Sequence, residues 1–192
     1  NNSAIYKGGG IYFYYAGAVF NVTERCNIYL NSAPAGSDLY AEWIEEIIEV
    51  VVDTFTVLNP THLHAMPFDH FTFDILNGKI QQVAADLYVS PSGNDENSGL
   101  TPDDPLKTIH HACQVIYADS LNPRKIHLLA GTYSPSATGE VFPVTPPDYI
   151  SLEGPGKNEA ILDAEGNSRV VELLWKEYVE ISGMTITGGN AA

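Results

Sequence analysis

The sequence predicts an all-β fold in which short parallel strands stack into a β-solenoid, and an internal repeat is the main reason. Residues 149–154 match residues 178–183 position by position, and both are followed by another short apolar segment. Without the loop at residues 155–159, the spacing of this pair is 24 residues, the same as from Ile126 to Ile150. Repeats of about 20 to 50 residues are typical of stacked architectures, because strands this short bury their apolar face only against the next turn.

The repeat assigns the short apolar segments to two parallel sheets. We expect residues 126–129, 149–152 and 178–181 to form one sheet. Residues 160–163 and 184–187 should form the other. Along each strand alternate side chains point inward, so both sheets should line one shared core.

The first 33 residues alternate glycine-rich turns with short apolar runs. Residues 11–15, 18–22 and 26–33 each keep one side apolar at a period of two, which is typical of strands. We therefore expect this segment to consist of strands separated by frequent turns.

The strand over residues 11–15 carries aromatic rings on both faces. Tyr12 and Tyr14 should point away from the side that Phe13 buries. The outward rings could bind sugar rings or a neighbouring subunit. Packing against another segment of the same protein is the interpretation that we favour at this stage.

Residues 38–58 fit both a helical stripe and a strand. Strand is favoured beyond Ile47 because the run is rich in β-branched residues, whereas a helical turn over residues 41–46 stays open. A further extended segment at residues 71–75 turns at Asn77 and Gly78 and leads to the central part of the chain.

The central stretch, residues 86–116, predicts a strand, a polar loop and a short helix. The strand covers residues 87–89, and the loop that follows is rich in Gly, Asn, Asp and Ser. Asp104 should cap a helix whose first residue is Pro105. An apolar stripe follows, so one helix face should be buried. The residues of this helix cap are Asp104, Pro105, Leu106, Ile109, Cys113 and Ile116.

Residues 88–109 read YVSPSGNDENSGLTPDDPLKTI, and this segment resembles the opening of right-handed parallel β-helix proteins of the pectin-lyase-like superfamily, specifically a surface or secreted type. In that family the strand and helix cap the open end of the solenoid. The segment at residues 126–133 is similar to the start of its first full coil. The resemblance covers residues 86–192, and two segments near the N-terminus are similar to coils from the far end of such helices.

The resemblance implies three regions and an unusual order. Residues 1–37 are expected to be C-terminal-type β-helix coils, residues 38–85 a β-rich linker, and residues 86–192 the capped N-terminal part of a β-helix. Written tail to head, the sequence reads TITGGNAANNSAIYKGGGIYFYY, which is a plausible continuous coil.

We therefore expect one period of a tandem array, or a subunit whose open C-terminal coil stacks on the N-terminal coils of the next copy. A head-to-tail contact that does not close produces a filament. An arbitrarily cut piece of a longer chain would show the same order. The expected self-assembly interface is Gly8, Gly9, Gly10, Ile11, Tyr12, Phe13, Met184, Thr185, Ile186, Thr187, Gly188, Gly189 and Asn190.

Charge and composition restrict the function classes. The chain has 9 basic and 24 acidic residues and a formal charge of −15, which repels nucleic acid and anionic lipid. No apolar run approaches the roughly 18 to 20 residues that would cross a membrane. The first residues do not resemble a signal peptide, and without an initiator Met the chain should be mature or an excerpt. Its richness in Tyr, Gly and Pro suggests a secreted or cell-surface protein.

Catalysis is the rival interpretation, because relatives of this fold cut polysaccharides. Lyase chemistry of that kind needs a basic residue beside acidic groups that hold a cation. None of the basic candidates lies one coil away in sequence from an acidic cluster. Hydrolases of this fold use several aspartates and a Gly-His-Gly segment, and this segment is missing too. The adjacent Asp103 and Asp104 are better explained by the helix start. We expect a non-enzymatic structural or adhesive module, with a polysaccharide-binding or polysaccharide-cleaving protein as the alternative. The basic candidates are Arg124, Lys125, Lys157, Arg169 and Lys176.

Metal and modification sites have weaker support. His62, His64 and His70 could ligate a metal, but two prolines place them in a loop, where we expect exposed histidines. We expect no resident cofactor. Calcium is the best candidate, at the oxygen-rich loop, although Asx turns explain the same residues. That loop contains Asn94, Asp95, Glu96 and Asn97.

The cysteines and one asparagine leave alternatives open. Cys26 and Cys113 could form one disulfide or remain thiols, and thiols are favoured because Cys113 lies on the apolar stripe. Asn21 and Thr23 form a glycosylation triplet, which matters only in a secreted protein of a suitable host.

Overall fold

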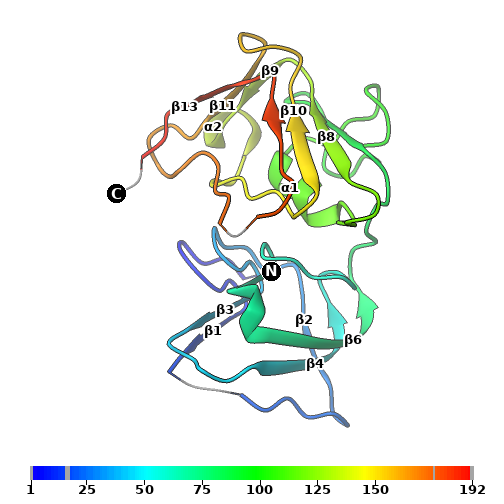
Figure 1. Ribbon diagram of the computed structural model, residues 1–192, viewed down its shortest axis with the longest axis vertical. Helices are drawn as coiled ribbons and strands as arrows, with labels where there is room; N and C mark the ends of the chain where they lie inside the picture. Colours follow the sequence, from blue (N-terminus) through cyan, green and yellow to red (C-terminus); the bar gives the residue numbers. More distant parts are fainter. Residues whose placement is uncertain (1, 16–17, 175, 191–192) are drawn as a thin grey trace. The chain divides into compact units, whose positions relative to one another are not determined.

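The computed structural model describes residues 2–15, 18–174 and 176–190. The chain divides into two compact units, Asn1–Gln82 and Val83–Ala192 (Figure 1). In both units the strands are parallel and stack into a β-solenoid, and helices are few. The predicted fold class, a parallel β-helix with a short capping helix, is confirmed.

The first unit has two parallel sheets, with strand orders β1-β3-β5 and β2-β4-β6. Each turn of chain adds one strand to each sheet, and apolar side chains between the sheets form the core. Phe13, Leu39, Val50 and Phe55 are among these buried residues. A short 3₁₀ helix, η1, precedes β6. The elements are β1 (Ile11–Tyr14), β2 (Cys26–Ile28), β3 (Leu39–Glu42), β4 (Ile48–Phe55), β5 (Ala65–Met66), η1 (Phe68–His70) and β6 (Phe71–Gly78).

The region expected as a linker, residues 38–85, instead supplies most of the strands of this first unit up to residue 82. β3 pairs with β1 and β4 pairs with β2, so the expected boundary after residue 37 falls inside one folded unit. The predicted strand beyond Ile47 forms as β4, whereas residues 41–46 contain no helical turn and residues 18–22 no strand.

The second unit has the same organisation, with strand orders β12-β10-β8-β7 and β13-β11-β9. Both expected sheets are therefore present, each extended by one strand. Helix α2 begins after Ser134, whose hydroxyl accepts from the Ala137 amide, and ends at Gly139 in the left-handed region. The elements are β7 (Leu87–Val89), α1 (Ile109–Val115), β8 (Arg124–Leu128), β9 (Gly131–Tyr133), α2 (Pro135–Thr138), β10 (Ile150–Glu153), β11 (Ala160–Asp163), β12 (Ile181–Ser182) and β13 (Thr185–Thr187).

The register of the first sheet differs from the sequence repeat by two residues at one place. Leu152 lies opposite Ile181, as the matched segments predict. Ile126, however, also lies opposite Leu152 rather than Ile150. The alignment of Ile126 with Ile150 that the 24-residue spacing implied was therefore wrong, although a shift of two residues keeps the same face inward because side chains alternate with period two.

The helix start is corrected as well. α1 begins at Ile109, with Thr108 as its N-cap, and not at Pro105 after Asp104. Leu106 is extended, and its amide donates to the Tyr88 carbonyl at 2.9 Å while its carbonyl accepts from Ser90 at 2.8 Å. Because Leu106 pairs with β7, the chain stays extended through Leu106 and becomes helical only after it. Asp104 accepts from the amide and hydroxyl of Ser98 instead.

Candidate functional site

The last turn of the second unit leaves its core side open. Ile186 lies opposite Leu162, on the same face of neighbouring strands. Leu162 is completely buried, whereas 48% of Ile186 is exposed. Ile181 is likewise half-buried, although its partner Leu152 has no exposed surface. The difference follows from position, because the inner strands are covered by a further turn and the edge strands β12 and β13 are not.

The opposite end of this unit is covered. Leu87 and Val89 of the edge strand β7 are completely buried. The extended segment around Leu106 pairs with β7, and α1 contacts the same strand. Among the predicted cap residues, Leu106, Ile109, Cys113 and Ile116 are all buried. The second unit therefore has one closed end and one open end.

A shallow hollow of about 440 Å³ lies at the open end. Along β13 and the residues after it, the chain is bonded to the preceding turn on one side only. The Gly166 amide donates to the Gly188 carbonyl at 2.7 Å, and Asn190 donates to the Ser168 carbonyl at 2.8 Å. The hollow is lined by Arg169, Val170, Val171, Ile186, Gly189 and Asn190.

The first unit presents a second edge at β1 and β2. Gly8 and Gly10 donate from their backbone to Ala35 and Asp38 of the next turn. A Cβ at Gly9 would lie 2.5 Å from the carbonyl oxygens of Ser32 and Ser37, so glycine is required where these two turns approach. A hollow of about 350 Å³ opens beside this edge. It is lined by Asn2, Gly10, Ile11, Cys26, Asn27, Ile28, Tyr29 and Asn31.

The predicted interface residues thus lie on two different edges. The backbone from residue 8 to residue 13 follows the β1 edge, where Phe13 points into the core and Tyr12 points out. Residues 184–190 follow the β13 edge. Both segments consist of uncharged residues, in a chain whose formal charge is −15.

The structure contains two buried carboxylates that the sequence did not predict. Asp38 is completely buried, and its Oδ1 accepts from the amide and side chain of Asn31. Burial raises the pKa of Asp38 to about 6. Glu140 is also buried; its two oxygens accept from the Ile109 and His110 amides at 2.8 Å each. Burial raises the pKa of Glu140 to about 7.

The oxygen-rich loop is occupied by contacts within the protein. Asp95 accepts from the amides of Lys107 and Thr108 and from the Thr108 hydroxyl. Asn94 accepts from the Glu96 amide, which is the expected Asx turn. The Asn97 side chain donates to the Pro105 carbonyl. A calcium ion would have to compete with these donors, so calcium binding stays a prediction. Among the described residues, no group of three or more His, Cys, Asp or Glu is arranged to hold a metal ion.

The histidines at residues 62, 64 and 70, expected to be exposed in a loop, are instead partly or completely buried. His64 is completely buried, near the hydroxyl of Thr61 and the ring of Phe55. The His62 ring lies 5.3 Å from the ring of Phe68. The two cysteines are free thiols, exposed at Cys26 and buried at Cys113, so the disulfide alternative is excluded.

Two of the basic residues considered for catalysis, Arg124 and Lys125, have polar contacts within the protein. Arg124 donates to the Tyr117 carbonyl at 2.6 Å and lies 3.9 Å from the Asp119 carboxylate. Lys125 pairs with Glu153 at 2.7 Å. Among the described residues, no helix is long and apolar enough to cross a membrane.

Comparison with known families supports the fold. Residues 91–171 match a family described as "Protein of unknown function (DUF1565)", a family of β-helix proteins. The match runs from the polar loop after β7 to the chain beyond β11, which is less than half of the chain. The resemblance to β-helix proteins is thereby confirmed. No curated protein and no solved structure matches the chain.

Proposed function

We propose that this β-helix protein is a non-enzymatic, extracellular structural or adhesive module whose coils continue end to end into a second copy or into the next period of a tandem array. The observation that carries the proposal is the exposed core position at Ile186, opposite the buried Leu162. A further turn of chain on this edge would bury it as the inner turns bury theirs.

Edge strands also favour a strand as the partner. A parallel edge strand uses its backbone donors and acceptors along one side only, so the other side is a template for pairing. Each backbone hydrogen bond formed there contributes about 1 kcal/mol net, and buried apolar surface adds roughly 25 cal/mol per Å². A few bonds and one or two covered aliphatic side chains would support a specific contact.

The β1 edge of a second copy is the occupant that fits best. Its glycine-rich segment allows the close backbone approach already used between the first and second turns. Both edge segments are uncharged, so stacking brings no charged side chain of either segment into the contact. The net charge of −15 on each chain still repels the two copies at longer distance. Composition supports an extracellular location.

Particle size at rising protein concentration tests this proposal. Sedimentation velocity and negative-stain microscopy should reveal end-to-end particles, and added salt should promote them by screening repulsion between acidic chains. Ile186→Asp should abolish the particles, because it places a charge in the contact. Leu121→Asp is the matched control, since Leu121 is an exposed aliphatic residue in a loop between α1 and β8.

Two results would contradict end-to-end assembly. Monomers at every concentration and salt would overturn the proposal. So would assembly that Ile186→Asp and Leu121→Asp leave equally intact.

A further inference from the structure

The outer face of the β1–β3 sheet carries an exposed strip of aromatic rings. Tyr12 and Tyr14 alternate with the buried Phe13, so they point outward, and Tyr40 lies beside Tyr12 on the next strand. Packing within the protein, the interpretation favoured from the sequence, leaves 46% of Tyr12 and 55% of Tyr14 exposed. We call these rings the aromatic strip; it consists of Tyr12, Tyr14, Tyr15, Tyr40 and Trp43.

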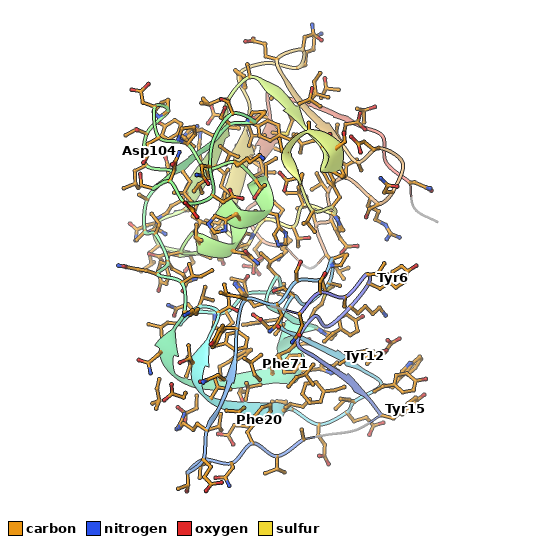
Figure 2. All side chains as sticks on the ribbon, turned by 180° about the vertical axis from the view of Figure 1, so that it is seen from behind. Tyr6, Tyr12, Tyr15, Phe20, Phe71 and Asp104 are labelled. Carbon is orange, nitrogen blue, oxygen red and sulfur yellow. The ribbon has the colours of Figure 1, made fainter. Side chains whose placement is uncertain are left out.

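The rings of the aromatic strip are continuous. Successive centroids lie 5.7 Å apart from Tyr40 to Tyr12, 6.1 Å from Tyr12 to Tyr14 and 4.8 Å from Tyr14 to Tyr15. Tyr15 and Trp43 are parallel to within 5°, at 5.9 Å. Figure 2 shows Tyr12 and Tyr15 along the same side of the first unit, with their side chains pointing away from the ribbon.

An unusual backbone geometry holds the last two rings. Tyr15 and Trp43 have φ angles of 50° and 58°, in the left-handed region that residues with a Cβ rarely adopt. Both follow strands that pair residue by residue, so the same turn occurs in two successive coils. Both side chains are more than 60% exposed, so burial of these rings does not explain the geometry. The same left-handed geometry recurs at Tyr149 and Tyr178 of the second unit, so it is a feature of the coil turns that here orients two rings of the strip.

Polar groups lie among the rings at fixed positions. The Glu42 carboxylate accepts from the Tyr12 hydroxyl at 2.6 Å and from the Lys7 ammonium at 3.0 Å. The Lys7 ammonium also lies 4.7 Å from the centre of the Tyr40 ring. These partners are preorganised, and the pair is neutral overall. The strip thus combines flat apolar faces with a few oriented donors and acceptors.

We propose that the aromatic strip is a binding site for a neutral polysaccharide. A pyranose ring has an apolar C–H face and a rim of hydroxyl groups, so the aromatic rings would pack on the face while Lys7 and Glu42 bond the rim. A row of several rings suits a chain of sugars better than a single one. The formal charge of −15 disfavours anionic polymers. This proposal does not depend on end-to-end assembly.

Affinity electrophoresis tests it with defined probes. Native gels containing laminarin, xyloglucan or hydroxyethylcellulose supply neutral glucans, and polygalacturonate supplies an anionic one. At least one neutral glucan should retard the protein, and polygalacturonate should not. Trp43→Ala should weaken retention about five- to tenfold, because one stacked ring is lost. Tyr12→Phe should retain most of the binding, since the ring remains.

The control is Tyr178→Ala, which removes a still more exposed ring, 79% against 64% for Trp43, from the other unit and should leave binding unchanged. Thermal unfolding by circular dichroism verifies that each variant is folded. A shift of tryptophan emission on adding the retained glucan, lost in Trp43→Ala, gives a second readout. The proposal is overturned if no neutral glucan retards the protein, if polygalacturonate binds equally well, or if Tyr178→Ala and Trp43→Ala lose binding alike.

Discussion

At the scale of single residues, Asp38 is a carboxylate placed beneath the edge strand β1. Its backbone carbonyl accepts from Gly10 and Ile11, which join the first two turns, while its side chain is completely buried. Burial raises its pKa to about 6 from 3.8, and hydrogen bonds from Thr56 and Asn31 offset only part of that change. The sequence contains no sign of this, because an aspartate that follows Gly and Ser resembles a turn residue.

The raised pKa makes a testable contribution to stability. The folded state keeps a proton on Asp38 between about pH 4 and 6 that the unfolded state releases, so stability falls as the pH rises through this window. Relative to Asp38→Asn, the wild type should lose up to about 3 kcal/mol of unfolding free energy between pH 4 and 7. Urea denaturation at several pH values measures it.

The control for this experiment is Asp103→Asn, which neutralises an exposed aspartate. Its stability difference from the wild type should be nearly independent of pH. An Asp38→Asn difference that is equally flat would show that the buried carboxyl titrates in its ordinary range.

At the scale of elements, every backbone amide from residue 107 to residue 111, at the start of α1, donates a hydrogen bond to a side chain. Asp95 accepts from Lys107 and Thr108, Glu140 accepts from the next two amides, and the Thr108 hydroxyl accepts from His111. Sequence patterns placed the helix at the right part of the chain. They misplaced its start because Leu106 pairs with β7, and because Glu140 lies about thirty residues further along the chain.

Removing Glu140 should therefore destabilise the cap of the second unit. Glu140→Ala would leave two amides at the start of α1 without acceptors, and such buried donors cost about 1 to 3 kcal/mol each. We expect a loss of about 2 kcal/mol or more in urea denaturation at pH 7. Glu96→Ala, which removes an exposed carboxylate from the nearby loop, should change stability by less than about 0.5 kcal/mol. Equal effects of the two variants would contradict this account of the cap.

At the scale of the whole molecule, the chain forms two units, and the division falls between residues 82 and 83. Each unit buries apolar residues of its own between two parallel sheets. The first unit needs both the N-terminal strands and residues 38–82, because β1 and β2 complete the sheets of β3 and β4.

Fragments should follow this division. Residues 83–192 alone should unfold cooperatively, because they retain every strand of the second unit. In residues 38–192, the segment 38–82 should lose protection from hydrogen exchange, since it lacks Phe13 and Ile28 of its core. Circular dichroism and exchange measured by mass spectrometry test both expectations. Full protection of residues 38–82 in that fragment would support an independent linker instead.

By itself the sequence determined what is periodic and local. Alternating apolar residues, turn-rich loops and matched segments were enough to predict stacked parallel strands, both sheets of the second unit and a buried helix face at Ile109 and Cys113. Only the tertiary structure decided what depends on distant partners. The two-residue register at Ile126, the capping of α1 by Glu140 and the burial of Asp38 all require knowing which turn lies beside which. That adjacency depends on loop lengths and on the sum of many contacts, and it leaves no pattern within a single segment.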